Sequence, residues 1–446
     1  MTLPFISRLC QAVAASDGRD AACRTLIGRA IADTVGVAAA GSLEPCARHA
    51  VAAYGGRSGQ GTRTWSGAWV ESEDAAALAD AIAAHALDFD DVFLDSATHP
   101  STVILPAILR LDRDDAPGEL IAAFAAGLIA ALSIAERLGP GHYHRGWHGT
   151  GTIGAFAATA AACRLLRLDE RRIAHAFALA AAQSGGLRVN FGTMAKPAQA
   201  GFAASVGVRA ARLAAAGVTG SPDVFAVGGY ADLYGVDGVA QSSAESLAPH
   251  PERIALKLYP CCYASHRLIG ITRDARAGIG ARLSGDVRIE VTAPAGSLDV
   301  LRYDVPTNGM EAKFSGRYCI AAALLDDVPT LAHFGETPLP TVVGGMTRVS
   351  LAEDPSQQSG GDIEAGCVRL VVRAADGDVV GAFAREAIPG SPRDPAAPEA
   401  VAAKLAACAA SFEREAGTAF PILAHAARIR EAAEWLPTGP QLRAAE

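Results

Sequence analysis

The first half of the chain alternates long apolar stretches with short connections that are polar or contain glycine. Capping residues open the stretch at 16–42 and a glycine closes it, and acidic residues open the stretch at 71–88, where they suit a helix N-terminus. The apolar positions predict serial helices at 16–42, 71–88, 106–111, 118–139, 152–168, 169–186 and 196–217. Several of these helices are hydrophobic enough to lie in the middle of an all-α domain.

The pattern changes near residue 260. A helix at 265–283 is followed by stretches whose polar and apolar residues alternate with a period of two, which is typical of strands. Strands are predicted at 286–296, 347–354, 367–377 and 378–387, with a helix at 311–327 among them and a polar loop at 354–366. We therefore expect a mostly α protein in three parts: an all-helical domain at 1–259, a smaller α+β domain at 260–393, and C-terminal helices at 394–446 that return to the helical domain.

Composition and charge exclude several classes of protein. Half of the 446 residues are hydrophobic but only 6% are aromatic, and the abundant alanine favours helices with small residues at their contacts. The net charge is −8 and no run of Lys or Arg occurs, which argues against nucleic acid as a partner. The apolar stretch at 120–135 is shorter than a membrane span and fits a buried helix, so no membrane partner is expected. The N-terminus shows no signal-peptide pattern and the nine cysteines contain no CxxC, which fits a cytoplasmic protein.

The residues "DFDDVFLDSATHP" at 88–100 concentrate four acids and a histidine, a set that invites a metal ion. No second group of ligands is evident elsewhere in the sequence, so we expect no metal. The lysines carry a different signal, because only four of the 39 Lys and Arg residues are lysines. A lysine can lose its proton when buried and an arginine cannot, so Lys196 and Lys257 are candidate functional residues, whereas Lys404 is expected on the surface of an ordinary helix.

A GxGxxG motif is formed by Gly149, Gly151 and Gly154, which would suit a dinucleotide site. The segment before it, "GHYHRGWH", is not a hydrophobic strand, and the flanking segments are helical. Without a βαβ unit the glycines cannot place a pyrophosphate at a sheet edge. We interpret them as the start of a helix and expect no cofactor; an iron–sulfur cluster at Cys261 and Cys262 is likewise not expected, because the other cysteines are scattered.

The chain resembles the MmgE/PrpD family, which includes 2-methylcitrate dehydratases, cis-aconitate decarboxylases and iminodisuccinate epimerases. The matching segments are "HALDFDDVFLDSATHPSTVILPAIL", "RGWHGTGTIGAFAATAAACRLLRLD", "NFGTMAKPAQAGFAASVGVRAARLAAAGVTG", "LKLYPCCYASH" and "AKFSGRYCIAAALLD". The stretch "VFLDSA" lacks the additional histidine and aromatic residue of the decarboxylases, and the dehydratases are longer chains with a different histidine stretch. The substrate is therefore not taken over from either subgroup.

The resemblance implies a helical domain built from both ends of the chain, an α+β lid domain, a homodimer, and a metal-free active site at the domain interface. Its motifs place six residues in that site: Asp88, His99, His148, Lys196, Lys257 and Tyr318. Arg188 is added as a possible carboxylate clamp.

The shared chemistry of the family changes the bonds at a carbon next to a carboxylate, which needs a tuned base and nearby cations. We expect His99 and His148 to act as acid and base, and Lys196 and Lys257 to bind carboxylates or, if desolvated, to act as base. Tyr318 is expected to donate a proton, and Asp88 to orient a neighbour.

The sequence predicts a lyase, first a hydro-lyase acting on a small di- or tricarboxylate such as 2-methylcitrate. A decarboxylase of a cis-aconitate-like acid and an epimerase of an iminodisuccinate-like acid are the alternatives, and a non-enzymatic binding protein is a further one. The other polar residues are interpreted as structural: His85, His175 and His425 as core histidines, and Asp90, Asp91 and Asp95 as mainly capping or surface acids.

Overall fold

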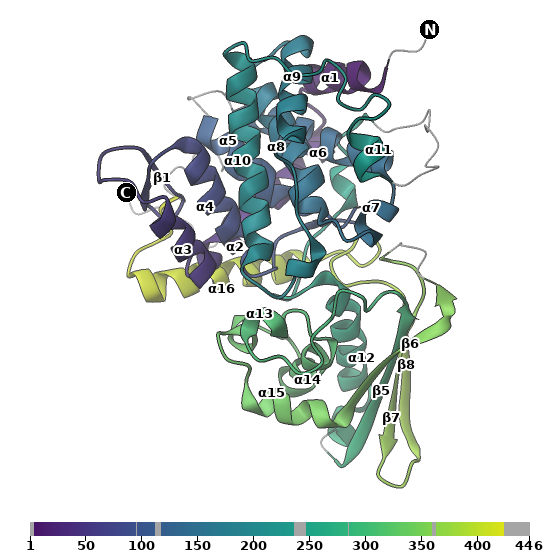
Figure 1. Ribbon diagram of the computed structural model, residues 1–446. Coiled ribbons are helices and arrows are strands. Elements are labelled where there is room, and N and C mark those ends of the chain that lie inside the picture. The colour runs from purple at the N-terminus through teal and green to yellow at the C-terminus, as the bar shows by residue number, and fades with distance from the viewer. Residues whose placement is uncertain are drawn as a thin grey trace. The chain divides into compact units, whose positions relative to one another are not determined.

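The computed structural model describes residues 4–94, 96–111, 117–235, 247–283, 285–358 and 363–422. The chain divides into two compact units. The first contains residues up to Val189, Lys196–Ile254 and the chain from Ala397 onward, and the second contains Asn190–Ala195 and Ala255–Ala396. The first unit is helical and the second combines helices with a sheet (Figure 1). The prediction of a mostly α protein with a smaller α+β domain is confirmed.

The first unit is a bundle of helices joined by short connections. Its α-helices are α1 (Phe5–Ala15), α2 (Ala21–Gly41), α3 (Pro45–Ala53), α4 (Glu73–His85), α5 (Ser101–Leu111), α6 (Pro117–Leu138), α7 (Gly141–His144), α8 (Gly149–Leu165), α9 (Glu170–Ala181), α10 (Ala195–Ala215), α11 (Tyr230–Tyr234) and α16 (Pro398–Ala416). Short strands accompany them: β1 (Thr62–Arg63), β2 (Trp69–Val70), β3 (Val92–Phe93) and β4 (Ile254–Ala255). Helix α16 comes from the C-terminal part of the chain and packs along α2 (Figure 1).

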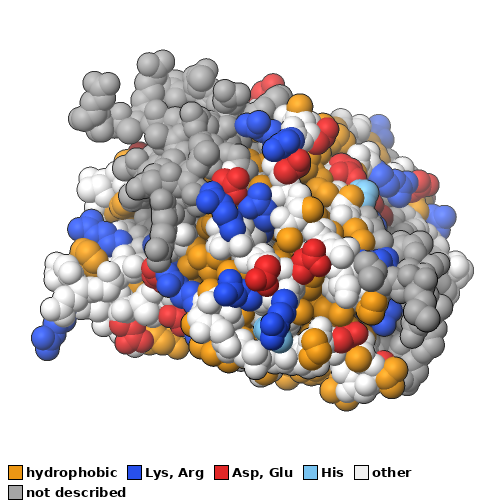
Figure 2. Space-filling view, turned by 90° about the horizontal axis from the view of Figure 1, so that it is seen from above, with side chains coloured by type: hydrophobic (Ala, Val, Ile, Leu, Met, Phe, Trp, Pro, Cys, Tyr) orange, Lys and Arg blue, Asp and Glu red, His pale blue; other side chains and the backbone are white. Residues whose placement is uncertain are grey.

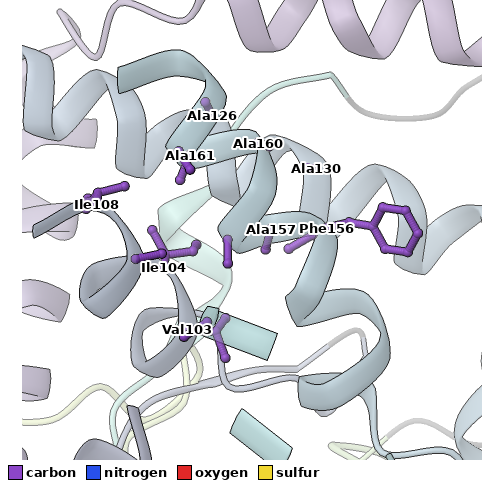
Figure 3. Close-up of a cluster of buried hydrophobic side chains, with 14 of the residues drawn as sticks. Val103, Ile104, Ile108, Ala126, Ala130, Phe156, Ala157, Ala160 and Ala161 are labelled. Carbon is purple, nitrogen blue, oxygen red and sulfur yellow. The ribbon is translucent and has the colours of Figure 1, made fainter. Parts of the chain in front are cut away.

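Small residues let the central helices of this unit approach closely. Figure 3 shows Ile104 and Ile108 of α5 beside the alanines of α6 and α8, including Ala126, Ala157 and Ala161. All of these side chains are buried. Alanine has no side-chain entropy to lose in a helix and leaves the facing backbone accessible, so the alanine-rich composition produces the close contacts that it predicts.

One helix among the described residues, Glu119–Leu138 within α6, is long and apolar enough to cross a membrane, and α2 and α3 pass the same test only as a pair bent by 84°. Helix α6 has 22 residues, so the expectation that its apolar stretch is too short for a span was wrong. Its side chains are nevertheless buried among other helices, as in Leu120, Phe124 and Leu132. Such burial is typical of a core helix.

The second unit is built around a four-stranded sheet with the order β6-β5-β7-β8. Its elements are α12 (His266–Leu283), β5 (Val287–Ala295), α13 (Gly309–Ala312), α14 (Gly316–Asp326), α15 (Pro340–Gly345), β6 (Val349–Gln358), β7 (Val368–Ala374) and β8 (Val379–Arg385). Strands β5 and β6 are parallel and the other pairs are antiparallel. Alternate residues of β5 and β7 are buried against α12 and α14, which cover one face of the sheet (Figure 1).

The four predicted strands are confirmed, but two local predictions need correction. The polar loop expected at 354–366 begins later, because β6 continues to Gln358. Strand β6 lies at the edge of the sheet, where the missing N–H of Pro355 is tolerated. The single helix expected at 311–327 is two helices, because Ser315 caps a new helix by accepting a hydrogen bond from the backbone N–H of Tyr318.

Charges of both signs are mixed on the face shown in Figure 2, with apolar side chains between them. Two ion pairs join helices of the helical unit: Arg209 of α10 pairs with Asp74 of α4 at 3.2 Å, and Arg212 of α10 pairs with Glu73 of α4. Exposed pairs of this kind contribute little to stability, but they mark where α10 crosses α4.

The glycines of the GxGxxG motif begin α8, as predicted, and they permit close packing. A Cβ atom on Gly151 would lie 2.1 Å from the carbonyl oxygen of Gly185, and one on Gly149 would lie 2.6 Å from Oγ1 of Thr98. Gly151 is therefore explained by the close approach of the Gly185 backbone, and Gly149 by the close approach of the Thr98 side chain.

Gly151→Ala is expected to destabilise the protein by about 1–3 kcal/mol, because backbone must move to admit the methyl group. Gly185→Ala is the matched control. A Cβ atom there meets no atom within 4 Å, so we expect a change below about 0.5 kcal/mol. Urea unfolding of both variants gives the comparison; equal stabilities would contradict the packing role of Gly151.

Candidate active site

The C-terminal end of α4 brings the predicted acidic segment into the interior of the helical unit. Helix α4 ends at His85, and the backbone N–H of Asp88 donates to the carbonyl of His85 at 3.1 Å. Asp88 adopts a left-handed conformation with φ of 49°, which is costly for most residues and less so for aspartate. This turn directs the chain back along the helix end, so that Asp88, Asp90 and Asp91 are all buried.

Lys196 lies at the centre of the resulting cluster. It sits in the first turn of α10, and its Nζ lies 3.1 Å from Oδ1 of Asp88 and 2.9 Å from Nε2 of His85. Its side chain is only 4% exposed. A buried ammonium needs both a counter-charge and hydrogen-bond acceptors, and these two residues supply them.

Asp90 joins two histidines. Its Oδ2 lies 2.8 Å from Nδ1 of His85 and 3.2 Å from Nδ1 of His99. Burial alone would raise the pKa of Asp90, but the charges and hydrogen bonds of the two histidines outweigh it and hold the pKa well below 3.8. Burial lowers the pKa of His85, while Asp90 acts in the opposite direction. Asp90 is therefore an anion that accepts from two imidazoles.

These contacts determine the tautomers of the rings. Nδ1 of His85 donates to Asp90, so Nε2 of the neutral ring accepts from Lys196. Nδ1 of His99 faces two oxygens, Oδ2 of Asp90 and the backbone carbonyl of Asp91 at 2.7 Å, and so it carries the hydrogen. Nε2 of neutral His99 then bears a lone pair, and it lies 4.0 Å from Oδ1 of Asp88. This nitrogen is able to take a proton.

His148 completes the group from the N-terminus of α8. It is the residue before the first turn of that helix, its backbone N–H donates to the carbonyl of Gly186 at 2.9 Å, and its ring centroid lies 5.9 Å from that of His85. Burial, and after it the charge of Lys196, hold the pKa of His148 well below 6.5. The ring is therefore neutral at physiological pH and can donate or accept a hydrogen bond without carrying charge.

The side chain and the backbone of Asp91 stabilise the loop between α4 and α5. Its carboxyl accepts from Oγ of Ser101 at the start of α5, and its backbone carbonyl holds His99. Burial raises the pKa of Asp91 to about 8, and the negative charges of Asp33 and Asp90 act in the same direction. Asp91 is thus a buried neutral acid below that pH.

The raised pKa of Asp91 predicts that the protein loses stability as the pH rises from about 4 to about 8. Its folded pKa of about 8 exceeds the ordinary aspartate value of 3.8, so the folded state holds the extra proton between these values. The contribution of Asp91 is full below about pH 4 and falls by up to about 1.4 kcal/mol per pH unit towards pH 8. Asp91→Asn cannot ionise, so urea unfolding at several pH values should show a flatter profile than wild type; parallel profiles would contradict a neutral Asp91.

The structure gathers four of the predicted residues in the helical unit, Asp88, His99, His148 and Lys196. Lys257 and Tyr318 are in the second unit, and both are buried there. The hydroxyl of Tyr318 donates to the carbonyl of His333 at 2.6 Å and accepts from the backbone N–H of Leu339 at 3.0 Å. Its role as a proton donor stays a prediction, and these backbone contacts favour a packing role.

Arg188, the possible carboxylate clamp, contacts Tyr143. Its guanidinium donates to the Tyr143 carbonyl at 3.0 Å and lies over the Tyr143 ring at 4.1 Å. Its role as a clamp also stays a prediction.

Sequence reasoning missed two members of the cluster, His85 and Asp90. His85 was interpreted as a core histidine and Asp90 as a capping or surface acid. In the structure, His85 accepts a hydrogen bond from Lys196, and Asp90 lies between the rings of His85 and His99. A signal was available, because His85 opens the segment "HALDFDD" and a turn after a helix end returns the next acids to it. His175 lies apart from the cluster, and its Nδ1 contacts the backbone carbonyl and N–H of Gly220 at 3.1 and 3.3 Å. His425 and Asp95 lie outside the described residues.

All four lysines of the chain are buried, with exposed fractions of 1–6%. The expectation that Lys404 is a surface residue was therefore wrong. Its Nζ lies 2.6 Å from Oδ1 of Asp33 and donates to the carbonyl of Phe89 at 2.7 Å. All four lysines are thus interior residues, so the scarcity of lysine in the composition marks Lys404 as well as Lys196 and Lys257.

The same cluster has the donor set of a metal site. One ligand atom from each of His85, Asp88, Asp90 and His99 lies within 4.8 Å of the others, the one such group found among the described residues. The ammonium of Lys196 already occupies the lone pairs of His85 and Asp88, and both Nδ1 atoms are donors to Asp90. Lys196 would therefore compete with a metal ion for His85 and Asp88, whereas Nε2 of neutral His99 keeps a lone pair, so the expected absence of a metal stays a prediction.

The fold and this centre define a mostly α protein with a helical unit, an α+β unit and a buried acid–base cluster built around a lysine. The sequence pattern of the MmgE/PrpD N-terminal domain matches residues 6–237, and that of the MmgE/PrpD C-terminal domain matches residues 259–425. The chain belongs to the MmgE/PrpD family.

Curated relatives carry the name cis-aconitate decarboxylase. The human protein is 26% identical over 298 residues, which cover 63% of this chain and 61% of the relative. The mouse protein is 27% identical over 305 residues, with the same coverage, and a protein of Aspergillus terreus is 25% identical over 328 residues, covering 66% of this chain and 67% of the relative. The chain thus spans about 61% of the length of the first two relatives.

Proposed function

We propose that the protein is a lyase that acts on a small di- or tricarboxylate by moving a proton at a carbon next to a carboxylate. The observation that carries this proposal is the buried cluster in which Lys196 contacts Asp88 and His85, and Asp90 joins His85 to His99. It combines a cation for a carboxylate with an imidazole nitrogen that can take or return a proton, in a site from which water is largely excluded.

Each residue has a definite part in this proposal. The ammonium of Lys196 binds the carboxylate beside the reacting carbon and stabilises the charge that develops there. Nε2 of His99 accepts or returns the proton, since Asp90 keeps the hydrogen of that ring on Nδ1. Neutral His148 donates a hydrogen bond to the substrate. The roles of Lys257 and Tyr318, which belong to the second unit, stay predictions from the family resemblance.

Among lyase reactions, decarboxylation of a cis-aconitate-like acid is favoured by the names of the relatives. Such a reaction replaces a bond to a carboxyl group by a bond to hydrogen, so it needs a proton donor and a cation, both of which the cluster contains. Dehydration of a 2-methylcitrate-like acid remains the second candidate, because the family includes dehydratases and the same groups would serve it. Epimerisation needs a second base on the opposite face of the carbon, a role open to His148.

One experiment separates these reactions. The protein is incubated with cis-aconitate, citrate, 2-methylcitrate and iminodisuccinate in deuterated water, and the products are followed by NMR. Carbon dioxide release with one deuterium in the product indicates a decarboxylase, loss or gain of water indicates a hydro-lyase, and deuterium exchange without net conversion indicates an epimerase. Absence of any change with all four acids would contradict the proposal for this substrate class.

A metal-free reaction is part of the proposal and is supported by the position of Lys196 among the possible ligands. Dialysis against EDTA is expected to leave turnover unchanged, and added Zn²⁺ or Mg²⁺ is expected not to raise it. A loss that a stoichiometric metal restores would contradict this part.

A homodimer, taken from the family resemblance, and a cytoplasmic location, taken from the cysteine content, also remain proposals. Exposed apolar side chains around the start of α10 offer a place to test it: Val189 is 64% exposed and Phe202 is 53% exposed. Sedimentation equilibrium should give twice the chain mass for wild type, and Phe202→Glu should weaken the dimer if this surface is buried in it.

A further inference from the structure

A second buried lysine of the helical unit, Lys404, contacts the loop that carries Asp88 and Asp90. Lys404 of α16 pairs with Asp33 of α2 at 2.6 Å, and the two side chains are 3% and 0% exposed. Both helices belong to the same unit as the cluster. Burying two charges costs free energy that their attraction only partly returns, so such a pair is weak evidence for stability and suggests a requirement for a specific geometry.

Lys404 contacts this loop at Phe89. The ammonium of Lys404 donates to the carbonyl of Phe89 at 2.7 Å and lies 4.2 Å from the centre of the Phe89 ring. Phe89 separates Asp88 from Asp90, and Asp88 is held in the left-handed conformation. This conformation costs free energy, although less for aspartate than for most residues, so contacts to the neighbouring backbone help to hold it. The contact with Lys404 is one such restraint, applied at the next residue.

We propose that Lys404, held in place by Asp33, is a positioning residue for the acid–base centre. By fixing the Phe89 carbonyl it sets the two neighbouring carboxylates, Asp88 toward Lys196 and Asp90 toward His85 and His99. The inference rests on the proposed function for its kinetic readout, but its structural readout does not. Lys404 touches no reacting atom in this proposal and acts through the backbone of Phe89.

The test replaces the whole ion pair, so that no charge is left buried alone. In Asp33→Leu/Lys404→Met the packing volume is roughly kept and stability need not fall, but the Phe89 carbonyl loses its donor. Lys404→Arg keeps the charge and the donors and is the conservative variant. Glu119→Gln/Arg164→Met removes a partly buried pair elsewhere in the unit, with Nη1 and Oε2 2.9 Å apart, and is the matched control.

Two readouts are taken on the full-length protein. With the substrate found in the panel above, Asp33→Leu/Lys404→Met should lower kcat about 10- to 100-fold with little change in KM, because the groups remain but their geometry loosens. Lys404→Arg should recover part of this loss, and the control pair should behave as wild type. Independently of any substrate, the ¹⁵N NMR signals of His99, assigned by their loss in His99→Asn, should shift from the Nδ1–H tautomer towards a mixture in the double variant only.

Unchanged His99 signals in a folded double variant would overturn the inference, as would a wild-type kcat. If the double variant does not fold, Asp33→Asn/Lys404→Gln replaces it under the same criteria. If wild type turns over none of the acids, the proposed function fails, and the NMR comparison alone still decides the role of Lys404.

Discussion

Lys196→Gln is expected to lower kcat/KM by about 10³-fold or more without unfolding the protein. Glutamine can still donate hydrogen bonds to Asp88 and His85, so the substitution removes mainly the positive charge. That charge lies in a buried cluster, where the side chains of Lys196 and Asp88 are each only 4% exposed. The effective dielectric constant is low there, so an ion acts more strongly on a developing carboxylate charge than it would in water. The loss should appear in kcat as well as in KM, because the interaction strengthens as charge builds up in the transition state.

The measurement is steady-state kinetics on the substrate identified by NMR, with circular dichroism and thermal unfolding to establish folding. Arg209→Gln is the matched control, since Arg209 is a cation of the same helix, α10, that pairs with Asp74 on the surface. We expect that control to remain within about twofold of wild type. Activity of Lys196→Gln within about threefold of wild type would remove Lys196 from the mechanism.

The elements of the fold were largely predictable because each carries its own periodic pattern. Helix α8 could be expected from its apolar repeat and the glycines at its start, and strands β5 and β7 from the alternation that buries one face. Prediction was less successful where tertiary contacts decide. The end of β6 depends on its position at the sheet edge, and the break between α13 and α14 depends on the cap at Ser315.

The candidate site was predictable in part, for a related reason. Asp88, His99, His148 and Lys196 were found from motifs, and the structure places them together. His85 and Asp90 were set aside because an isolated histidine or acid in a helical protein is more often structural. Both residues join the cluster because the chain turns at Asp88, which adopts a left-handed conformation. The pattern of hydrophobic residues does not predict this turn. Lys404 was expected on the surface because its helix looked ordinary in the sequence. Its partners Asp33 and Phe89 lie more than 300 residues earlier in the chain, so the sequence gives no sign of these contacts.

Asp90→Asn tests whether a residue that the sequence analysis placed among capping acids governs the chemistry of the site. The substitution keeps the shape of the side chain but removes the anion that orients His85 and His99 and stabilises their charged forms. With an amide in its place, both rings lose a charged acceptor at Nδ1: His85 loses its Asp90 partner, and His99 keeps only the Asp91 carbonyl and a neutral amide. The Nδ1–H tautomers are then less favoured, and the fraction of His99 that presents an acceptor at Nε2 falls. We expect kcat to fall by about 10²- to 10³-fold, as for other losses of a residue that orients a catalytic imidazole.

The pH dependence of Asp90→Asn distinguishes this role from simple destabilisation. In wild type the charge of Asp90 raises the pKa of His85 against the lowering effect of burial. Without that charge the protonated imidazoles are less favoured, so the acid limb of kcat/KM should move to lower pH in rates measured from about pH 5 to pH 9. Asp74→Asn, at the other end of α4, should leave the profile unchanged. A variant of Asp90 that loses stability but keeps the wild-type profile would show that the acid only supports the fold, and the base would then have to be sought outside the pair of rings that Asp90 joins.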